Sequence, residues 1–182
     1  MISSPMIRLP RGRLVPYAAD HDEATVRWLN TADIQSTFGF SSTLTIASHR
    51  AWLAAASNAA MWAILDEPGS HCGNVLLHIS GKHRSAYFQI YLGEPSARGR
   101  GLGKSVLEAV LAHAFDDMAL HRVWLHTRPD NLQAERLYRR GGFVVEGVER
   151  DALLHGAGFI SQTRWSILEH EWRESARFVV AP

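Results

Sequence analysis

The chain has 182 residues, of which 46% are hydrophobic and 20% are charged, which is typical of one folded domain and excludes disordered and fibrous classes. Nineteen Lys and Arg against 18 Asp and Glu give a net charge of +1, so the basic excess of a general nucleic-acid binder is missing. Cys72 is the only cysteine and no apolar run approaches the roughly 20 residues that cross a bilayer, so we expect one cytoplasmic domain over residues 1–182, without a membrane partner.

The N-terminal third predicts a strand followed by two helices. The capping pattern of Asp20 and Glu23 favours a helix that continues through Leu29. The remaining predicted elements here are a strand at 13–17, a polar loop at 36–45 and a helix at 47–56, which turns Trp52 and Leu53 toward the core.

The middle of the chain changes to short apolar runs. Residues 61–65, 75–79 and 86–92 are separated by turn residues and predict three consecutive antiparallel strands. A long helix at 100–118 and a strand at 123–127 follow. This β-α-β order predicts one parallel pair inside an otherwise antiparallel sheet.

The last third predicts a short helix and two strands. Asp130 is the expected N-cap and Gly141 the expected left-handed C-cap of a helix at 128–140. Strands follow at 143–148 and 159–168. The sum is an α/β fold with a mixed, mostly antiparallel, twisted sheet of about seven strands and helices on both faces. The last strand, if left at an edge, could pair across a dimer, so we expect a monomer or a homodimer.

A glycine-rich segment, Arg98-Gly99-Arg100-Gly101-Leu102-Gly103, joins the strand that ends near Leu92 to the long helix. Glycines let successive N–H groups surround an anion at a helix N-terminus, and Lys104 adds charge. The segment fails the Walker A and dinucleotide patterns by one position each. It satisfies the pattern Arg-x-x-Gly-x-Gly, which predicts binding of a phosphate or pyrophosphate.

This segment resembles the pyrophosphate-binding loop of the GNAT superfamily of acetyl-CoA-dependent N-acetyltransferases. Asn131 at the start of a short helix, Tyr138 inside it and Gly142-Phe143 before the next strand extend the similarity. The stretch HRVWLHTRPDNLQAERLYRRGGFVVEGVERD resembles the family almost throughout, and the resemblance covers residues 11–171.

The resemblance implies acetyl-CoA as the acyl donor and no metal. It implies that a bulged strand splays away from its parallel neighbour and that Ile90, Tyr91 and Leu92 of this strand bind the pantetheine arm. The pyrophosphate would lie against Arg98, Gly99, Arg100, Gly101, Leu102, Gly103, Lys104 and Ser105. On the short helix, Asn131, Ala134 and Tyr138 would face the cofactor, with Tyr138 as the general acid that protonates the departing thiolate.

The general base is left open by the sequence. Relatives often have Glu on the strand before the loop, whereas this chain has Tyr87 and then Gln89 there. Water, Glu94, His126 or Glu146 could accept the proton when the amine attacks the thioester directly within a ternary complex. The ten histidines show no metal-ligand spacing.

The acceptor is expected to be a primary amine on a small molecule, such as an amino sugar. Two alternatives are a protein N-terminal acetyltransferase of the ribosomal-protein type, which acts on a peptide amine, and a non-catalytic acyl-CoA sensor. The residues expected to touch the acceptor are Trp28, Asn30, Gln35, Phe38 and Gln89.

Overall fold

The computed structural model describes residues 1–39 and 42–179, without the side chains of 175–179. Its eight strands form one sheet in the order β1-β2-β3-β4-β5-β6-β8-β7, and every neighbouring pair is antiparallel except β5 and β6. The predicted mixed, mostly antiparallel sheet is therefore confirmed, with one strand more than expected. The strands are β1 Ile7–Leu9, β2 Gly12–Pro16, β3 Ala59–Leu65, β4 His71–Ser80, β5 Ser85–Leu92, β6 Arg122–Thr127, β7 Val144–His155 and β8 Gly158–Leu168.

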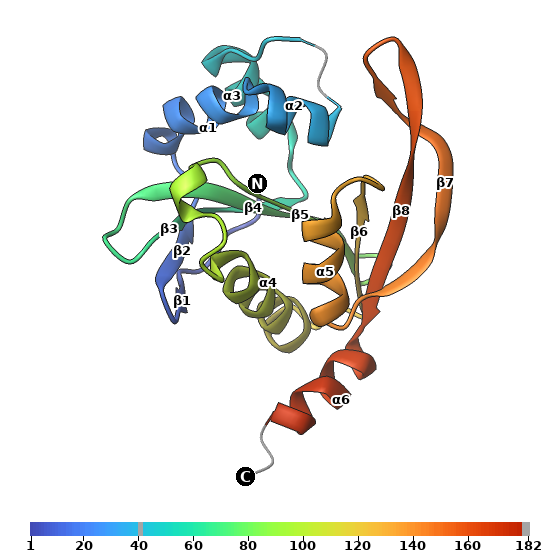
Figure 1. Ribbon diagram of the computed structural model, residues 1–182. Coiled ribbons are helices and arrows are strands. Elements are labelled where there is room, and N and C mark those ends of the chain that lie inside the picture. Colours follow the sequence, from blue (N-terminus) through green and yellow to red (C-terminus); the bar gives the residue numbers. More distant parts are fainter. Residues whose placement is uncertain (40–41, 180–182) are drawn as a thin grey trace.

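Helices cover both faces of this sheet (Figure 1). On one face α4 (Leu102–Ala112) and α5 (Leu132–Arg140) pack over the main core, in which Trp62, Phe88 and Leu107 are almost fully buried. The helices over the other face are α1 (Asp22–Leu29), α2 (Ala32–Phe38) and α3 (Ile46–Ala55). Neighbouring residues of β3 show the division, because Trp62 belongs to the main core and Met61 to a smaller cluster on the opposite face.

The parallel pair β5–β6 is short. Its ladder joins Ser85 to Arg122 and ends with Tyr87 opposite Trp124. Beyond this pair β5 remains bonded to β4, and β6 remains bonded to β8. We call residues 88–92 of β5 and 125–127 of β6 the splayed ends.

The splay predicted from the sequence is therefore confirmed, but the predicted bulge in β5 is wrong. The β4–β5 register runs without a shift from Ser80 opposite Ser85 to Gly73 opposite Leu92. The two strands diverge because each follows its own antiparallel partner, and no extra residue is needed.

The first helices differ from prediction in their ends. Asp20 lies in a 3₁₀ turn, Ala19–His21, and makes no capping hydrogen bond, so α1 begins at Asp22. The predicted loop at 36–45 is partly helical, since α2 continues to Phe38 and ends at Gly39 with a φ of 72°. Residues 40 and 41 of that loop lie outside the described residues.

The third helix lies at its predicted position, and Leu53 packs against a core cluster as predicted, but Trp52 does not. Trp52 is 41% exposed, and His49 is the buried residue of α3. The apolar character of Trp52 suggested a core position, but the helix presents this ring to a cavity described below.

The predicted long helix begins at Leu102 and changes to π-helical geometry at His113–Asp117. Helix α5 is capped by Asn131, whose Oδ1 accepts a hydrogen bond from the Ala134 N–H (3.1 Å). The predicted cap Asp130 is wrong, because its carboxylate instead accepts hydrogen bonds from Arg128.

The predicted left-handed Gly141 is also wrong, since its φ is −81°. The next residue, Gly142, has a φ of 87° and makes the turn.

The C-terminal strands form a long hairpin that was only partly predicted. β7 extends to His155, seven residues beyond its expected end at Val148, and β8 lies between β6 and β7. β1 and β7 form the edges of the sheet, so β8 is not the edge strand that the suggested pairing across a dimer requires. An unpredicted helix, α6 (Glu169–Val179), follows, and its Trp172 packs against Phe115 with ring centroids 6.1 Å apart.

Candidate active site

The glycine-rich loop, residues 98–103, lies between the end of β5 and the start of α4. Gly99 and Gly101 have φ values of 74° and 81°, a region that side chains with a Cβ rarely adopt. No heavy atom lies within 4 Å of the position that a Cβ would take at either residue. Glycine is therefore required here by the backbone conformation and not by lack of space, and the open side is free for a ligand.

Arg98 fixes this loop to two other elements. Its Nε donates to the Leu92 carbonyl at the end of β5 (3.0 Å), and its Nη1 donates to the Asp33 carboxylate of α2 (2.7 Å). Arg100 is exposed, and Lys104 lies 3.2 Å from the Glu108 carboxylate one turn later. The charge most accessible to an anion at the loop is thus that of Arg100 and Lys104.

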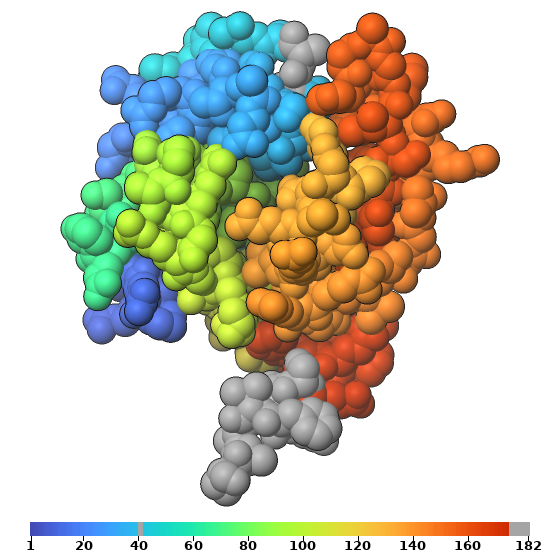
Figure 2. All heavy atoms as spheres, in the orientation of Figure 1, coloured from blue at the N-terminus to red at the C-terminus, as the bar shows by residue number. Residues whose placement is uncertain are grey.

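Helix α5 lies next to this loop on the same face of the molecule, as the neighbouring yellow-green and orange-yellow surfaces in Figure 2 show. Its Asn131 side chain is occupied by the cap, and Ala134 packs against the main core. The segments predicted to hold the two ends of one cofactor are therefore adjacent in space.

Tyr138 of α5 is 6% exposed, and its ring packs against Phe88 and Phe143, with centroids 6.3 and 5.5 Å away. Within the described part of the chain, no group is hydrogen-bonded to its hydroxyl. Every fully buried side-chain oxygen in that part has a hydrogen-bond partner, so the Tyr138 hydroxyl is not fully buried. Burial raises the pKa of Tyr138, and the nearby Tyr87 contributes in the same direction. The phenol is therefore protonated at neutral pH and can donate a proton.

The opposite face of the splayed ends carries polar and aromatic side chains. Tyr87 and Trp124, the last pair of the parallel ladder, have ring centroids 4.6 Å apart. Gln89 and His126 follow two residues later on their strands, so they lie on the same face as that pair. His126 Nε2 lies 3.0 Å from a Glu149 carboxylate oxygen, which defines the His126–Glu149 pair.

Arg164 of β8 completes this cluster. Its Nε lies 3.0 Å from the second Glu149 oxygen and 3.4 Å from His126 Nε2. Its guanidinium carbon is 4.6 Å from the centre of the Trp124 ring. The Glu149 carboxylate thus compensates the arginine charge and can also stabilise an imidazolium at His126.

The two carboxylates considered as bases are bound elsewhere. Glu94 accepts hydrogen bonds from Arg27 (2.7 Å) and from the Trp28 indole (2.9 Å). Glu146 accepts from Arg122 and Ser166, and the Arg122 guanidinium lowers the pKa of this carboxyl to about 2. A carboxyl with that pKa is a poor proton acceptor at neutral pH, so His126 has the better position and chemistry.

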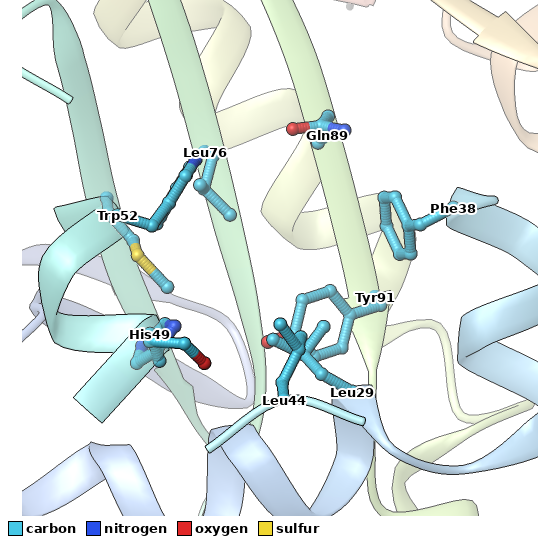
Figure 3. A pocket seen from close by; sticks show the side chains of 10 residues that line it. Leu29, Phe38, Leu44, His49, Trp52, Leu76, Gln89 and Tyr91 are labelled. Carbon is cyan, nitrogen blue, oxygen red and sulfur yellow. The ribbon is translucent and has the colours of Figure 1, made fainter. Parts of the chain in front are cut away.

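A cavity of about 160 Å³ lies between the sheet and α1–α3 (Figure 3). Of the residues expected at the acceptor, Phe38 and Gln89 line it. Trp28 is buried, and its indole N–H donates to Glu94. The amide of Asn30 donates to the Leu44 carbonyl and accepts from the Leu44 N–H. Trp28 and Asn30 therefore have structural roles.

Gln35 does not line the cavity. Its lining residues are Leu29, Phe38, Leu44, Ser48, His49, Trp52, Met61, Leu76, Gln89 and Tyr91. His49 and Trp52 were missed, although their spacing of three residues places them on one side of a helix.

Other reactive groups give no second site. Buried Cys72 donates to the Ile64 carbonyl, and burial raises the pKa of its thiol to about 12, which opposes a nucleophilic role. Among residues 1–39 and 42–179 no three His, Cys, Asp or Glu side chains are placed to hold a metal ion. No helix in those ranges has the length and apolar character needed to cross a membrane.

Comparison with known proteins agrees with this geometry. A family model described as an acetyltransferase (GNAT) domain matches residues 11–144. A spermidine N(1)-acetyltransferase of Vibrio cholerae is 38% identical over 72 residues, which cover 40% of this chain and 41% of that protein. The chain therefore spans less than half the length of this curated relative.

Two solved structures share the fold. The crystal structure of spermidine N-acetyltransferase from Vibrio cholerae in complex with CoA and spermine has a TM-score of 0.82 at 22% identity, covering 88% of this chain and 96% of that one. A ribosomal L7/L12 alpha-N-protein acetyltransferase in complex with coenzyme A has a TM-score of 0.80 at 19% identity, covering 90% and 98%.

Proposed function

The chain belongs to the GNAT acetyltransferase family, and from this premise we propose that it transfers the acetyl group of acetyl-CoA to a primary amine. The observation that carries the proposal is the parallel ladder that ends at Tyr87 and Trp124, with the glycine-rich loop at the end of the same strand. In the described part of the chain the β5–β6 ladder stops at Tyr87 and Trp124, so an extended pantetheine arm can bind the main chain of residues 90–92 on that side, where the Leu92 carbonyl also accepts a hydrogen bond from Arg98 Nε.

The donor would lie along the α4–α5 face. The N–H groups of the glycine-rich loop, with Arg100 and Lys104, offer positive charge to a pyrophosphate at the start of α4. Tyr138 stands on this face beside the splayed ends, which is where the sulfur of a bound thioester would arrive. It would protonate the departing thiolate.

The acceptor would approach from the other face. There the His126–Glu149 pair can take the proton that the ammonium must lose before it attacks the thioester. The amine attacks the carbonyl carbon, the carbon–sulfur bond breaks, and the products are an N-acetylated amine and CoA. Because acid and base lie on opposite sides of the reacting bond, both can act on one tetrahedral intermediate.

Similarity to a spermidine N(1)-acetyltransferase supports a small amine as the acceptor. The amino sugar expected from the sequence has no support among these comparisons. A peptide N-terminus remains a second candidate on resemblance alone, because the neighbour that acts on a ribosomal protein shares the fold at 19% identity.

The test is to measure acetyl-CoA binding by calorimetry and thiol release with a panel of polyamines, amino sugars, simple alkylamines, ring-bearing amines and peptides. Amine-dependent thiol release, with the acetylated amine identified by mass spectrometry, supports the proposal. If acetyl-CoA does not bind, the proposal is overturned. Binding without transfer to any amine would favour the sensor function.

A further inference from the structure

The cavity under α1–α3 is built on one row of the sheet. Met61 of β3, Leu76 of β4 and Gln89 of β5 are register partners, so their side chains stand side by side on its floor. Phe38 and Trp52 also line the cavity, and Figure 3 shows Trp52 near Leu76 and Phe38 on the side of Gln89. The volume of about 160 Å³ is close to that of engineered apolar cavities that bind benzene.

Among the described residues that line this cavity there is no carboxylate and no ammonium. Asp22 lies behind His49 and is already bound, since its carboxylate accepts hydrogen bonds from Tyr17 (3.0 Å) and Arg50 (2.6 Å). His49 Nε2 is hydrogen-bonded to the same Tyr17 hydroxyl (2.9 Å), and burial lowers the pKa of His49, so the ring is neutral at neutral pH. The cavity thus offers no charge to a ligand.

Few polar atoms in the lining are free for a ligand. The Tyr91 hydroxyl accepts a hydrogen bond from Asn74 (2.7 Å), and Gln89 Oε1 lies 3.2 Å from His78 Nε2. A sugar would bury hydroxyls without partners, and a polyamine would bury an unpaired ammonium, both of which are costly. Aromatic surfaces are plentiful, because the rings of Phe38 and Tyr91 meet edge to face at 5.7 Å and the Trp52 ring also lines the cavity.

The cavity also adjoins the splayed ends. Gln89 belongs to its floor and lies two residues, about 7 Å, beyond Tyr87 at the end of the parallel ladder. A ring held above Gln89 can therefore extend a short chain toward the gap between β5 and β6, where His126 stands on the same face.

Resting on the proposed function, we propose that the acceptor is a primary amine joined by a short alkyl chain to a single uncharged ring, and that the ring occupies this cavity. The ring supplies binding free energy by burying apolar surface. The chain leaves the amino group outside the cavity, at the His126–Glu149 pair.

The experiment compares kcat/KM for 2-phenylethylamine, n-propylamine, spermidine and glucosamine at saturating acetyl-CoA. We expect 2-phenylethylamine to exceed each of the others at least tenfold. Equal or higher kcat/KM for spermidine or glucosamine would overturn the acceptor class while leaving acetyl transfer established. If none of the four is acetylated although acetyl-CoA binds, the acceptor class is overturned, and the wider panel with peptides decides whether acetyl transfer fails as well. The binding measurement separates that result from a misfolded protein.

A cavity-filling variant tests the location of the ring. Leu76→Trp should lower kcat/KM for 2-phenylethylamine at least tenfold more than it lowers kcat/KM for n-propylamine, and the Kd of acetyl-CoA should stay within about twofold. Leu154→Trp, at a position that is 51% exposed, is the matched control and should change none of these. The milder Leu76→Phe serves if the first variant does not fold. An equal loss for both amines would overturn the placement.

Discussion

His126 and Tyr138 lie on opposite faces of the sheet, on either side of the splayed ends of β5 and β6. Tyr138 packs against Phe88, whose side chain points into the main core, whereas His126 lies beside Tyr87, with ring centroids 5.6 Å apart. Successive residues of a strand point to opposite faces, so Tyr87 and Phe88 fix the two sides. An acyl group held between the strands would have a proton donor on one side and a proton acceptor on the other.

Tyr138→Phe should lower kcat by about 10²-fold or more, because the proton for the thiolate would have to come from water. The Kd of acetyl-CoA and the melting temperature should change little, since the hydroxyl has no partner among the described residues. Thiol release and calorimetry measure the two quantities. An unchanged kcat would assign Tyr138 to packing alone.

His126→Gln should lower kcat/KM by about 10²-fold at pH 7, because the group that takes the proton from the ammonium is lost. Glu149→Gln should cause a smaller loss, because it removes only the compensating charge. His83→Gln, at an exposed turn position, is the matched control. An unchanged kcat/KM in His126→Gln would show that water or another group takes the proton.

Gly101→Ala should weaken acetyl-CoA binding tenfold or more, because alanine at a φ of 81° is strained by about 1–2 kcal/mol and the loop would move to relieve it. Gly81→Ala is the control, since Gly81 also has open space around its Cβ position but no positive φ. Calorimetric titration of both variants compares them. Equal affinities would mean that the loop conformation does not determine cofactor binding.

Glu146→Gln should reduce stability in a pH-dependent way. The folded-state pKa of Glu146 is lowered to about 2 by Arg122, so its stabilisation is present above the ordinary carboxyl pKa of about 4.3 and is lost as the pH falls toward 2. The carboxylate is 34% exposed and its pair is screened by solvent, so we expect about 1 kcal/mol at pH 7 and none near pH 2. Urea unfolding at several pH values measures it.

For this prediction Glu67→Gln, an exposed residue in a turn, is the control and should be neutral throughout. A constant difference between pH 7 and pH 2 would contradict the role of the ion pair. Activity should be retained in Glu146→Gln, because this carboxylate is engaged by Arg122 and Ser166.

The sequence predicted the elements that carry local patterns. The three consecutive antiparallel strands β3–β5, the parallel pair and the positive-φ glycines of the loop follow from apolar runs, a β-α-β order and glycine spacing, whereas β1 was not predicted. Boundaries that depend on competition between neighbours were missed. Asn131 and Asp130 are both residue types that commonly cap helices. Asn131 is the N-cap of α5, because the Asp130 carboxylate accepts hydrogen bonds from Arg128 instead.

The acceptor side was the least predictable part of the site. Trp28 and Asn30 carry side chains suited to a ligand, but tertiary contacts to Glu94 and Leu44 use them. The partner of His126 is Glu149 of β7. This pair could not be predicted, because the predicted strand ends at Val148, one residue before Glu149. Contacts between residues far apart in sequence decide these roles, and single-sequence patterns do not record them.

Helix α2 connects the two halves of the site, since its Asp33 binds Arg98 of the glycine-rich loop and its Phe38 lines the cavity. A diphosphate that binds the Arg98 guanidinium would compete with Asp33 for it. The ion pair that holds α2 to the glycine-rich loop would then change, and α2 also carries Phe38. Coupling free energy between two ligands is reciprocal. The factor by which acetyl-CoA changes the affinity for the amine must then equal the factor by which the amine changes the affinity for acetyl-CoA.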